Sequence, residues 1–274
     1  MSSVSSGAEA LSDRIHALCS SFRLPTVAAE AVPRFTDAGQ ADALETLLEV
    51  LELEAGDRQQ RRVDRLRRAS KLPAGKTLET LELDRFPTQL QQRFKELLRG
   101  EFLEHSINVL AFGLPGTGKS HAMCALGRRL IEDGHSVLFI PTYQLVQSLL
   151  AAKRDLVLPR ALRKLDSFEV LILDDLGYVK QHPDEAEVLF TLIAERYERR
   201  SLIVTSNVVF SQWDQIFQSP MATAAAIDRI VHHSVILEFD VPSYRTEKAR
   251  ESRATSQEGK EKAKKQSERR NRQK

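Results

Sequence analysis

The 274-residue sequence predicts an α/β fold: a three-layer core with a parallel β-sheet, preceded by a small helical module. Five short apolar runs rich in Val, Ile and Phe have the length of strands, and they lie at 107–112, 136–140, 170–173, 202–205 and 235–239. Helical patterns separate these runs, notably at 119–132, 143–153 and 184–199. Strands that alternate with helices imply a parallel sheet that is covered on both faces.

The region before the first apolar run divides into a short tail and a helical module. Residues 1–7 are rich in serine, and we expect them to be disordered. Residues 8–75 are expected to form a helical module that binds a partner or DNA. One helical stripe consists of Leu44, Leu47, Leu48 and Leu51. A basic run at 58–71 follows, and its candidate DNA contacts are Arg61, Arg62, Arg65 and Arg68. The core is then expected at 76–245.

Positive charge is concentrated in blocks, although the formal net charge is only +2. Residues 246–274 hold 11 Lys and Arg against five Glu, and alanine is their only apolar residue. We therefore expect this segment to be a disordered basic tail. Blocks of positive charge suit a polyanion such as nucleic acid, but solvated helix faces and a solubilising tail would have the same composition.

Composition argues against several classes of protein. No apolar run approaches the ~18 residues of a membrane helix, and Met1–Ser21 lacks the pattern of a secretory signal. Cys19 and Cys124 are too few for a disulfide framework or a four-ligand zinc site. His182, His232 and His233 have no cysteine or carboxylate partner at ligand spacing. We expect a cytoplasmic protein with no membrane partner.

A phosphate-binding loop is predicted at 113–120, where GLPGTGKS matches G-x-x-x-x-G-K-[ST] between a strand and a helix. Glycines allow backbone N–H groups to turn inward and surround phosphates. Lys119 is expected to contact the β and γ phosphates, and the Ser120 hydroxyl to hold Mg²⁺. The residues expected to bind the nucleotide are Gly113, Pro115, Gly116, Thr117, Gly118, Lys119, Ser120 and His121.

The second half of such a site is predicted at 170–175, where the apolar strand VLIL ends in two carboxylates. Asp174 is expected to hold the Mg²⁺ shell, and Asp175 to orient or activate the attacking water. Residues 174–177 would also fit the D-x-x-G motif of a GTPase. The three asparagines of the chain are followed by Val, Val and Arg, so no N-K-x-D guanine motif is present and ATP is the preferred nucleotide.

Polar and basic residues could complete this site. The segment LIVTSN ends in Thr205, Ser206 and Asn207, and a polar side chain at the tip of a strand can contact the γ-phosphate and the attacking water. Charge that develops on the γ-phosphate could be met by Arg196, Arg229 or Arg245, and spacing does not choose among the three.

In chain order, the motifs GLPGTGKS, VLILDDLGY, ERYERR, LIVTSN-x-x-F-x-x-W, AAIDRIVHHS and SYR resemble those of IstB-type ATPases. These ATP-binding helpers are encoded beside the transposase of certain bacterial insertion sequences. The chain is similar also to the DnaC and DnaI helicase loaders of the same AAA+ branch. The resemblance covers about residues 60–250 and implies an AAA+ core with a five-stranded parallel sheet.

The resemblance also implies roles for individual residues. Asn207 would be sensor 1, Arg229 the finger that reaches the ATP of a neighbouring subunit, and Arg245 sensor 2. Residues 143–165 would form an insertion that faces DNA inside a helical oligomer, with the basic side chains Lys153, Arg154, Arg160, Arg163 and Lys164. One departure from the wider AAA+ class is Asp175, where glutamate is usual; Asp-Asp is nevertheless usual in the IstB-like branch.

We therefore expect an ATP-dependent helper of DNA transposition. An ATP-driven homo-oligomer would bind duplex DNA and recruit or activate the transposase, and Mg²⁺-dependent hydrolysis would reset it. One alternative is a replicative helicase loader, which would prefer single strands and a helicase partner. Another is an ATP-gated scaffold without hydrolysis, for which Asp175→Ala would leave function intact while Lys119→Ala would abolish it.

Overall fold

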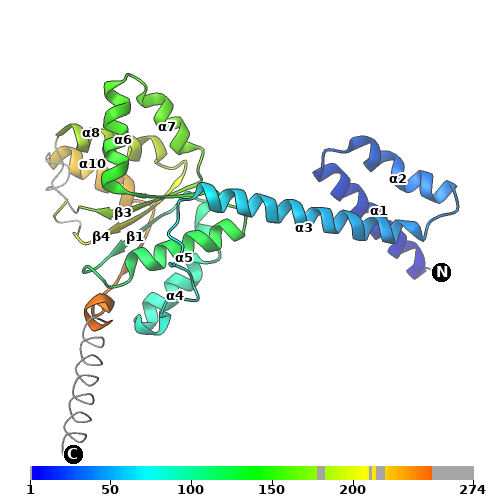
Figure 1. Ribbon diagram of the computed structural model, residues 1–274, viewed down its shortest axis with the longest axis horizontal. Helices are drawn as coiled ribbons and strands as arrows, with labels where there is room; N and C mark the ends of the chain where they lie inside the picture. Colours follow the sequence, from blue (N-terminus) through cyan, green and yellow to red (C-terminus); the bar gives the residue numbers. More distant parts are fainter. Residues whose placement is uncertain (1, 178–182, 210–211, 214–219, 249–274) are drawn as a thin grey trace, which may run out of the picture. The chain divides into compact units, whose positions relative to one another are not determined.

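The computed structural model of the chain describes residues 2–177, 183–209, 212–213 and 220–248 (Figure 1). The chain divides into two compact units, Met1–Arg65 and Leu66–Lys274. This boundary lies inside the basic run at 58–71 and inside helix α3 (Ala43–Ala69), earlier than the boundary that we expected at residue 75. A continuous helix carries the chain through the boundary, so the sequence has no Pro or Gly signal there.

The first unit is helical, as the sequence predicts. It contains α1 (Ser2–Ser21), α2 (Pro25–Asp37) and most of α3. Its apolar core consists of Ile15, Cys19, Ala28, Leu44 and Leu51. Leu47 and Leu48 pack against this core, so the predicted leucine stripe faces inward. Residues 2–7, which we expected to be disordered, are the first part of α1.

The second unit contains a five-stranded sheet in the order β2-β3-β4-β1-β5. The strands are β1 (Asn108–Phe112), β2 (Val137–Pro141), β3 (Val170–Leu176), β4 (Ser201–Ser206) and β5 (Ser234–Glu238). Every neighbouring pair is parallel. The predicted α/β class and the five predicted strands are therefore confirmed, and strand β3 extends to Leu176, beyond the expected end at 173.

Helices cover both faces of the sheet. The helices that follow the strands are α5 (Lys119–Glu132), α6 (Thr142–Arg154), α7 (Leu158–Asp166), α8 (Pro183–Arg196) and α10 (Pro220–Val231). Figure 1 shows α6, α8 and α10 on one face of the sheet and α5 with α4 (Thr88–Leu97) on the other. Short 3-10 turns at Leu83–Arg85 and Glu101–Leu103 flank α4.

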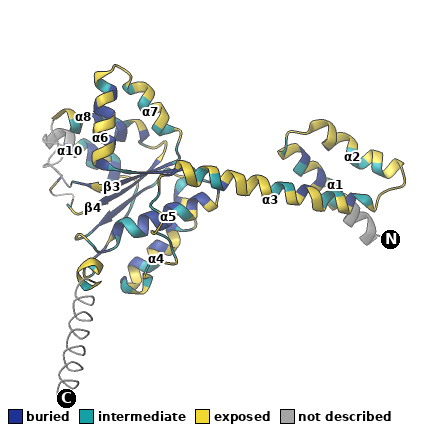
Figure 2. Ribbon diagram, in the orientation of Figure 1, coloured by how far each residue is buried: buried dark blue, intermediate teal, exposed yellow. Residues whose placement is uncertain are grey.

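The apolar core of this unit lies between the strands and the helices. Alternate residues of the strands face α6 and α8, so Leu171 and Leu173 belong to one cluster with Leu145 and Leu189. The residue between them, Ile172, faces α5, where a Cβ on Gly127 would lie 2.7 Å from its Cδ1 atom. Strands β1, β3 and β4 are accordingly buried along most of their length (Figure 2). This two-sided burial explains the continuous apolar runs of the sequence.

Because all five strands are parallel, their carboxyl ends meet at one edge of the sheet. The loop 113–118 follows β1, Asp174 and Asp175 lie near the end of β3, and Asn207 follows β4. These segments meet because β1 and β3 both pair with β4.

Among the described residues, no helix combines the length and apolar character needed to cross a membrane. Residues 244–248 form a helical turn after β5, and the remainder of the predicted basic tail lies outside the described residues.

Candidate functional site

The loop between β1 and α5 has the backbone geometry that its glycines predict. Gly113, Gly116 and Gly118 have φ angles of 151°, 85° and 99°, which residues with a Cβ rarely adopt. A Cβ on Gly113 would lie 2.6 Å from the carbonyl oxygen of Phe239, and one on Gly116 would collide with Ser243 Oγ. The loop is therefore shaped by a close approach of the segment after β5, and glycine is required at both positions.

Lys119, the first residue of α5, is buried and points back into the loop. Its Nζ atom donates hydrogen bonds to the carbonyl oxygens of Gly113 at 2.7 Å and Leu114 at 2.9 Å. Burial lowers the pKa of the Lys119 ammonium, while the nearby carboxylates of Asp175 and Asp174 oppose that shift. The structure thus brings the predicted lysine and both predicted carboxylates into one electrostatic neighbourhood.

Asp174 and Asp175 are both hydrogen-bonded to Thr205, which the sequence marks only as part of a polar cluster. The hydroxyl of Thr205, on β4, donates to Asp174 Oδ1 at 2.7 Å and accepts the backbone N–H of Asp175 at 2.9 Å. Thr205 is fully buried, and Asp174 is 9% exposed. One buried hydroxyl therefore positions the carboxylate expected to hold Mg²⁺ and the backbone of the residue expected to orient water.

The backbone at Asp175 is left-handed, with φ of 59°, and the pairing of β3 with β4 shifts register between Leu173 and Leu176. This irregularity turns the side chain of Asp175 outward from the sheet edge, where it is exposed. Partial burial raises the pKa of the Asp175 carboxyl, Asp174 raises it further, and Lys119, Lys76 and Arg245 oppose the shift. A carboxyl with a raised pKa is a better proton acceptor than a free aspartate when it is ionised.

The segment after β5 packs directly on the phosphate-binding loop. The backbone N–H of Tyr244 donates to the carbonyl oxygen of Gly116 at 3.0 Å. The charge of the next residue, Arg245, acts on both Lys119 and Asp175, and its side chain is exposed. The structure therefore places Arg245 beside the predicted nucleotide site of its own chain.

The other predicted nucleotide contacts differ in what they touch. Thr117 Oγ1 donates to the carbonyl oxygen of Leu114 at 2.9 Å, which closes the loop on itself. Ser120 lies in the first turn of α5 beside Lys119. His121 turns toward the 77–80 turn, with its Nε2 atom 3.0 Å from both Thr80 Oγ1 and the carbonyl oxygen of Thr77. Pro115 and Asn207 are exposed at the carboxyl edge of the sheet.

The three candidate arginines occupy different environments. Arg196 is 1% exposed and donates to the carbonyl oxygens of Leu165, Phe168, Glu169 and Ser201. Burial lowers the pKa of its guanidinium to about 10. These acceptors lie where β3 and β4 begin, at the edge of the sheet opposite the loop, so Arg196 has a structural role and is no candidate for the γ-phosphate.

Arg229 lies in the last turns of α10 and is partly buried. Its Nη1 atom donates to the carbonyl oxygen of Ala225 at 3.0 Å, and its guanidinium lies 5.1 Å from the ring centroid of Phe190 on α8. Within one chain the structure therefore holds Arg229 against α8, whereas Arg245 lies beside the loop.

The basic side chains predicted to contact DNA are mostly exposed. On α6 and α7 these are Arg154, Arg160, Arg163 and Lys164. On α3 they are Arg61, Arg62, Arg65 and Arg68. Two of the candidates form ion pairs within the chain: Arg61 Nη2 lies 3.3 Å from Glu54 Oε2, and Lys153 Nζ donates to Glu187 Oε2 at 2.7 Å and lies 3.6 Å from Asp184 Oδ1. The hydrogen bond to Glu187 raises the pKa of Lys153, so this ammonium is already partly neutralised within the chain.

Proteins with similar sequences are named as ATP-binding proteins, as expected for a chain with this phosphate-binding loop. A protein of Sinorhizobium fredii, named as an insertion sequence ATP-binding protein, is 41% identical over 88% of this chain and 82% of its own length. A second, named for the insertion sequence IS5376 of Geobacillus stearothermophilus, is 34% identical over 88% of this chain and 96% of its own length.

Solved structures share the fold of the second unit. The crystal structure of DnaI has a TM-score of 0.52 and 18% identity, and the match covers 62% of this chain and 95% of the chain in that structure. AMPPCP-bound DnaA from Aquifex aeolicus has a TM-score of 0.51 and 19% identity, over 62% of this chain and 51% of that one. The predicted three-layer core with a parallel five-stranded sheet is therefore confirmed. The family model of IstB-like ATP-binding proteins matches residues 17–252, and the chain belongs to this family.

Proposed function

We propose that this chain is a Mg²⁺-dependent ATPase that assists the transposition of an insertion sequence. In this proposal, ATP drives assembly of a homo-oligomer on duplex DNA, the oligomer recruits or activates the transposase, and hydrolysis resets it. The observation that carries the ATPase part is the arrangement of Lys119, Asp174 and Asp175 around a glycine loop, with Thr205 bonded to both aspartates. Family membership and the names of the relatives support the role in transposition.

The residues present fit a nucleotide and its metal ion. The φ angles of Gly113, Gly116 and Gly118 hold the loop in a conformation that residues with a Cβ rarely adopt, and a loop of this kind can direct backbone N–H groups toward phosphates. Oxygen ligands suit Mg²⁺, and the Ser120 hydroxyl and the Asp174 carboxylate would hold it. When bound, Mg²⁺ would neutralise charge that develops on the phosphates. Lys119 would exchange its two carbonyl acceptors for phosphate oxygens, and Asp175 would orient the attacking water and accept its proton.

The assignment of Arg229 as a finger in trans is the oligomeric part of the proposal. The resemblance to IstB-type ATPases supports this role, and Arg229 is only partly buried within its own chain. Arg229→Ala should then lower turnover by up to ~10³-fold while nucleotide binding survives. Mixing this variant with Lys119→Ala should restore part of the activity at mixed interfaces. Two folded variants that restore none would contradict the trans assignment.

The exposed basic side chains of α6 and α7 support binding to DNA through its phosphates. Such binding should weaken with salt and depend little on sequence. Arg163→Ala should make the plot of log K for DNA binding against log salt concentration less steep, by about the one unit of slope that corresponds to one phosphate contact. Lys153→Ala is the matched comparison and should reduce the slope less, because Lys153 already pairs with Glu187 and Asp184. Equal effects of the two variants would show that the pairing of Lys153 does not persist on DNA.

Sedimentation velocity with a slowly hydrolysed ATP analogue tests the proposal as a whole. Large assemblies that need both nucleotide and duplex DNA would support the transposition helper. Assembly on single strands alone would favour a helicase loader instead, and a monomer under every condition would overturn the oligomeric mechanism. A transposition assay with Asp175→Ala and Lys119→Ala separates the remaining alternatives: a helper that must hydrolyse ATP loses function with either variant, whereas a non-hydrolysing scaffold loses function only with Lys119→Ala.

A further inference from the structure

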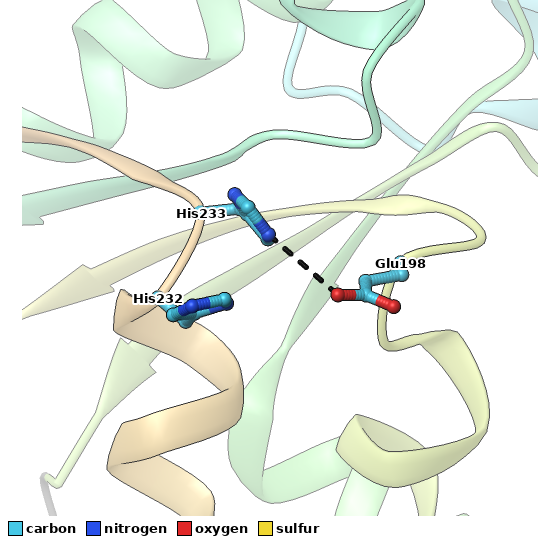
Figure 3. Close-up of side chains that lie close together, drawn as sticks. All are labelled: Glu198, His232 and His233. Atoms are coloured by element: carbon cyan, nitrogen blue, oxygen red, sulfur yellow. Dashed lines mark ion pairs between the residues drawn. The ribbon is translucent and has the colours of Figure 1, made fainter.

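Two histidines and a glutamate converge on a surface far from the nucleotide loop in sequence. His232 and His233 lie between the end of α10 at Val231 and the start of β5 at Ser234. Glu198 lies in the turn between α8 and β4. Figure 3 shows the three side chains together, with Glu198 opposite the two imidazole rings. Because the histidines and the glutamate are 34 residues apart, their spacing in the sequence does not indicate this cluster.

The geometry of the cluster is close to that of a metal site. One ligand atom from each residue lies within 4.8 Å of the other two. His233 Nε2 is 3.6 Å from Glu198 Oε1, and the two imidazole centroids are 4.2 Å apart. Zn²⁺ binds such nitrogen and oxygen ligands at about 2.0–2.2 Å, so small rotations of exposed side chains would bring all three into one coordination sphere. A water molecule can take the fourth position, because all three residues are exposed.

One histidine is also oriented by a neighbour outside the cluster. Tyr197 Oη lies 3.2 Å from His232 Nδ1, which leaves Nε2 of that ring for a ligand. Histidines that bind metals are commonly held in this way by a hydrogen bond to the second ring nitrogen. Glu198 has a left-handed backbone with φ of 56°, an unusual conformation for glutamate.

From this arrangement we propose that Glu198, His232 and His233 form a binding site for a divalent transition metal such as Zn²⁺. Two imidazoles and one carboxylate favour zinc, nickel or copper over Mg²⁺, which prefers oxygen ligands. The site would link the turn after α8 to the end of α10. It lies where β4 and β5 begin, at the sheet edge opposite the phosphate-binding loop, so it is separate from the Mg²⁺ position expected at Ser120 and Asp174.

The test is a titration of the full chain, free of nucleotide and of any added histidine tag, with Zn²⁺ by calorimetry and with Co²⁺ by visible absorption. The wild type should bind one ion per chain, and Co²⁺ should show the intense d–d bands of a four-coordinate site. His233→Ala and Glu198→Gln should each weaken binding at least tenfold, the lower end of the effect seen when even a supporting residue of a metal site is removed. Both positions are exposed, so the variants should keep the wild-type circular dichroism spectrum.

A matched control comes from a second histidine–carboxylate pair. His135 Nδ1 lies 3.5 Å from Glu169 Oε2, but no second histidine joins this pair among the described residues. His135→Ala should therefore bind Zn²⁺ as the wild type does. The proposal would be overturned by a wild type that binds no Zn²⁺ at equimolar concentration, or by an affinity that His233→Ala and Glu198→Gln leave unchanged. Because no ATP is present, the result is independent of the proposed ATPase function.

Discussion

Replacing Thr205 with valine is expected to slow ATP hydrolysis while leaving nucleotide binding nearly intact. Valine has almost the same shape as threonine but no hydroxyl, so the buried volume at β4 is kept. The change removes the hydrogen bond to Asp174 and leaves the backbone N–H of Asp175 without its acceptor. Lys119, which would hold the phosphates, makes its hydrogen bonds to the carbonyl oxygens of Gly113 and Leu114 and not to Thr205.

The expected magnitude follows from the hydrogen bond to the charged carboxylate. Such bonds contribute about 1.5–3 kcal/mol, and each 1.4 kcal/mol corresponds to about tenfold in rate. If this energy serves to hold both aspartates in the transition state, kcat should fall by roughly 10- to 150-fold. Thr205→Ser keeps the hydroxyl and should retain most of the activity.

The assay is phosphate release at saturating Mg²⁺ and ATP, with nucleotide affinity measured separately by a fluorescent analogue. Thr191→Val is the matched control, because the hydroxyl of Thr191 donates to the carbonyl oxygen of Glu187 within α8 and should not affect kcat. The reasoning would be refuted by a folded Thr205→Val variant whose kcat is within twofold of the wild type. It would also be refuted if Thr205→Ser were as slow as Thr205→Val.

Three further predictions concern the buried arginine, the loop and the pH dependence. Arg196→Met should reduce the free energy of unfolding in urea by on the order of 3 kcal/mol, because four carbonyl oxygens lose a charged donor; a change no larger than that of the exposed Arg199→Met would contradict this. Gly116→Ala should abolish binding of a fluorescent nucleotide, since the new Cβ would meet Ser243 and the φ angle of 85° disfavours alanine; wild-type affinity would exclude that strain. Burial and Asp174 raise the pKa of Asp175, so its active, ionised form is lost as pH falls through a value above the ~3.9 of a free aspartate. The rate of hydrolysis should therefore decline at a pH where the protein is still folded by circular dichroism, and a rate that stays flat down to about pH 4 would contradict the assignment.

Patterns local in the sequence predicted most of the fold. The apolar run at 107–112 corresponds to β1 at Asn108–Phe112, and the helical pattern at 119–132 corresponds to α5 at Lys119–Glu132. A strand buried on both faces is a continuous apolar run, and a helix that packs on a sheet has apolar residues at helical spacing. Both patterns can therefore be recognised in the sequence. The P-loop was predictable for the same reason: glycine, lysine and serine act there within eight consecutive residues.

By itself, the sequence determined the α/β class, the strands, the phosphate-binding loop and the pair of aspartates at the end of β3. Only the tertiary structure decided which residues, distant in the sequence, contact the loop and the aspartates. Thr205 lies about thirty residues from the aspartates that it contacts, and the pairing of β3 with β4 brings them together. The same pairing buries Arg196 at the opposite edge of the sheet, while the segment after β5 brings Arg245 to the loop. Glu198 meets His232 and His233 across the turns that lead into β4 and β5. The physical reason is that strand order and register set these distances, whereas sequence patterns report only on neighbours within one element.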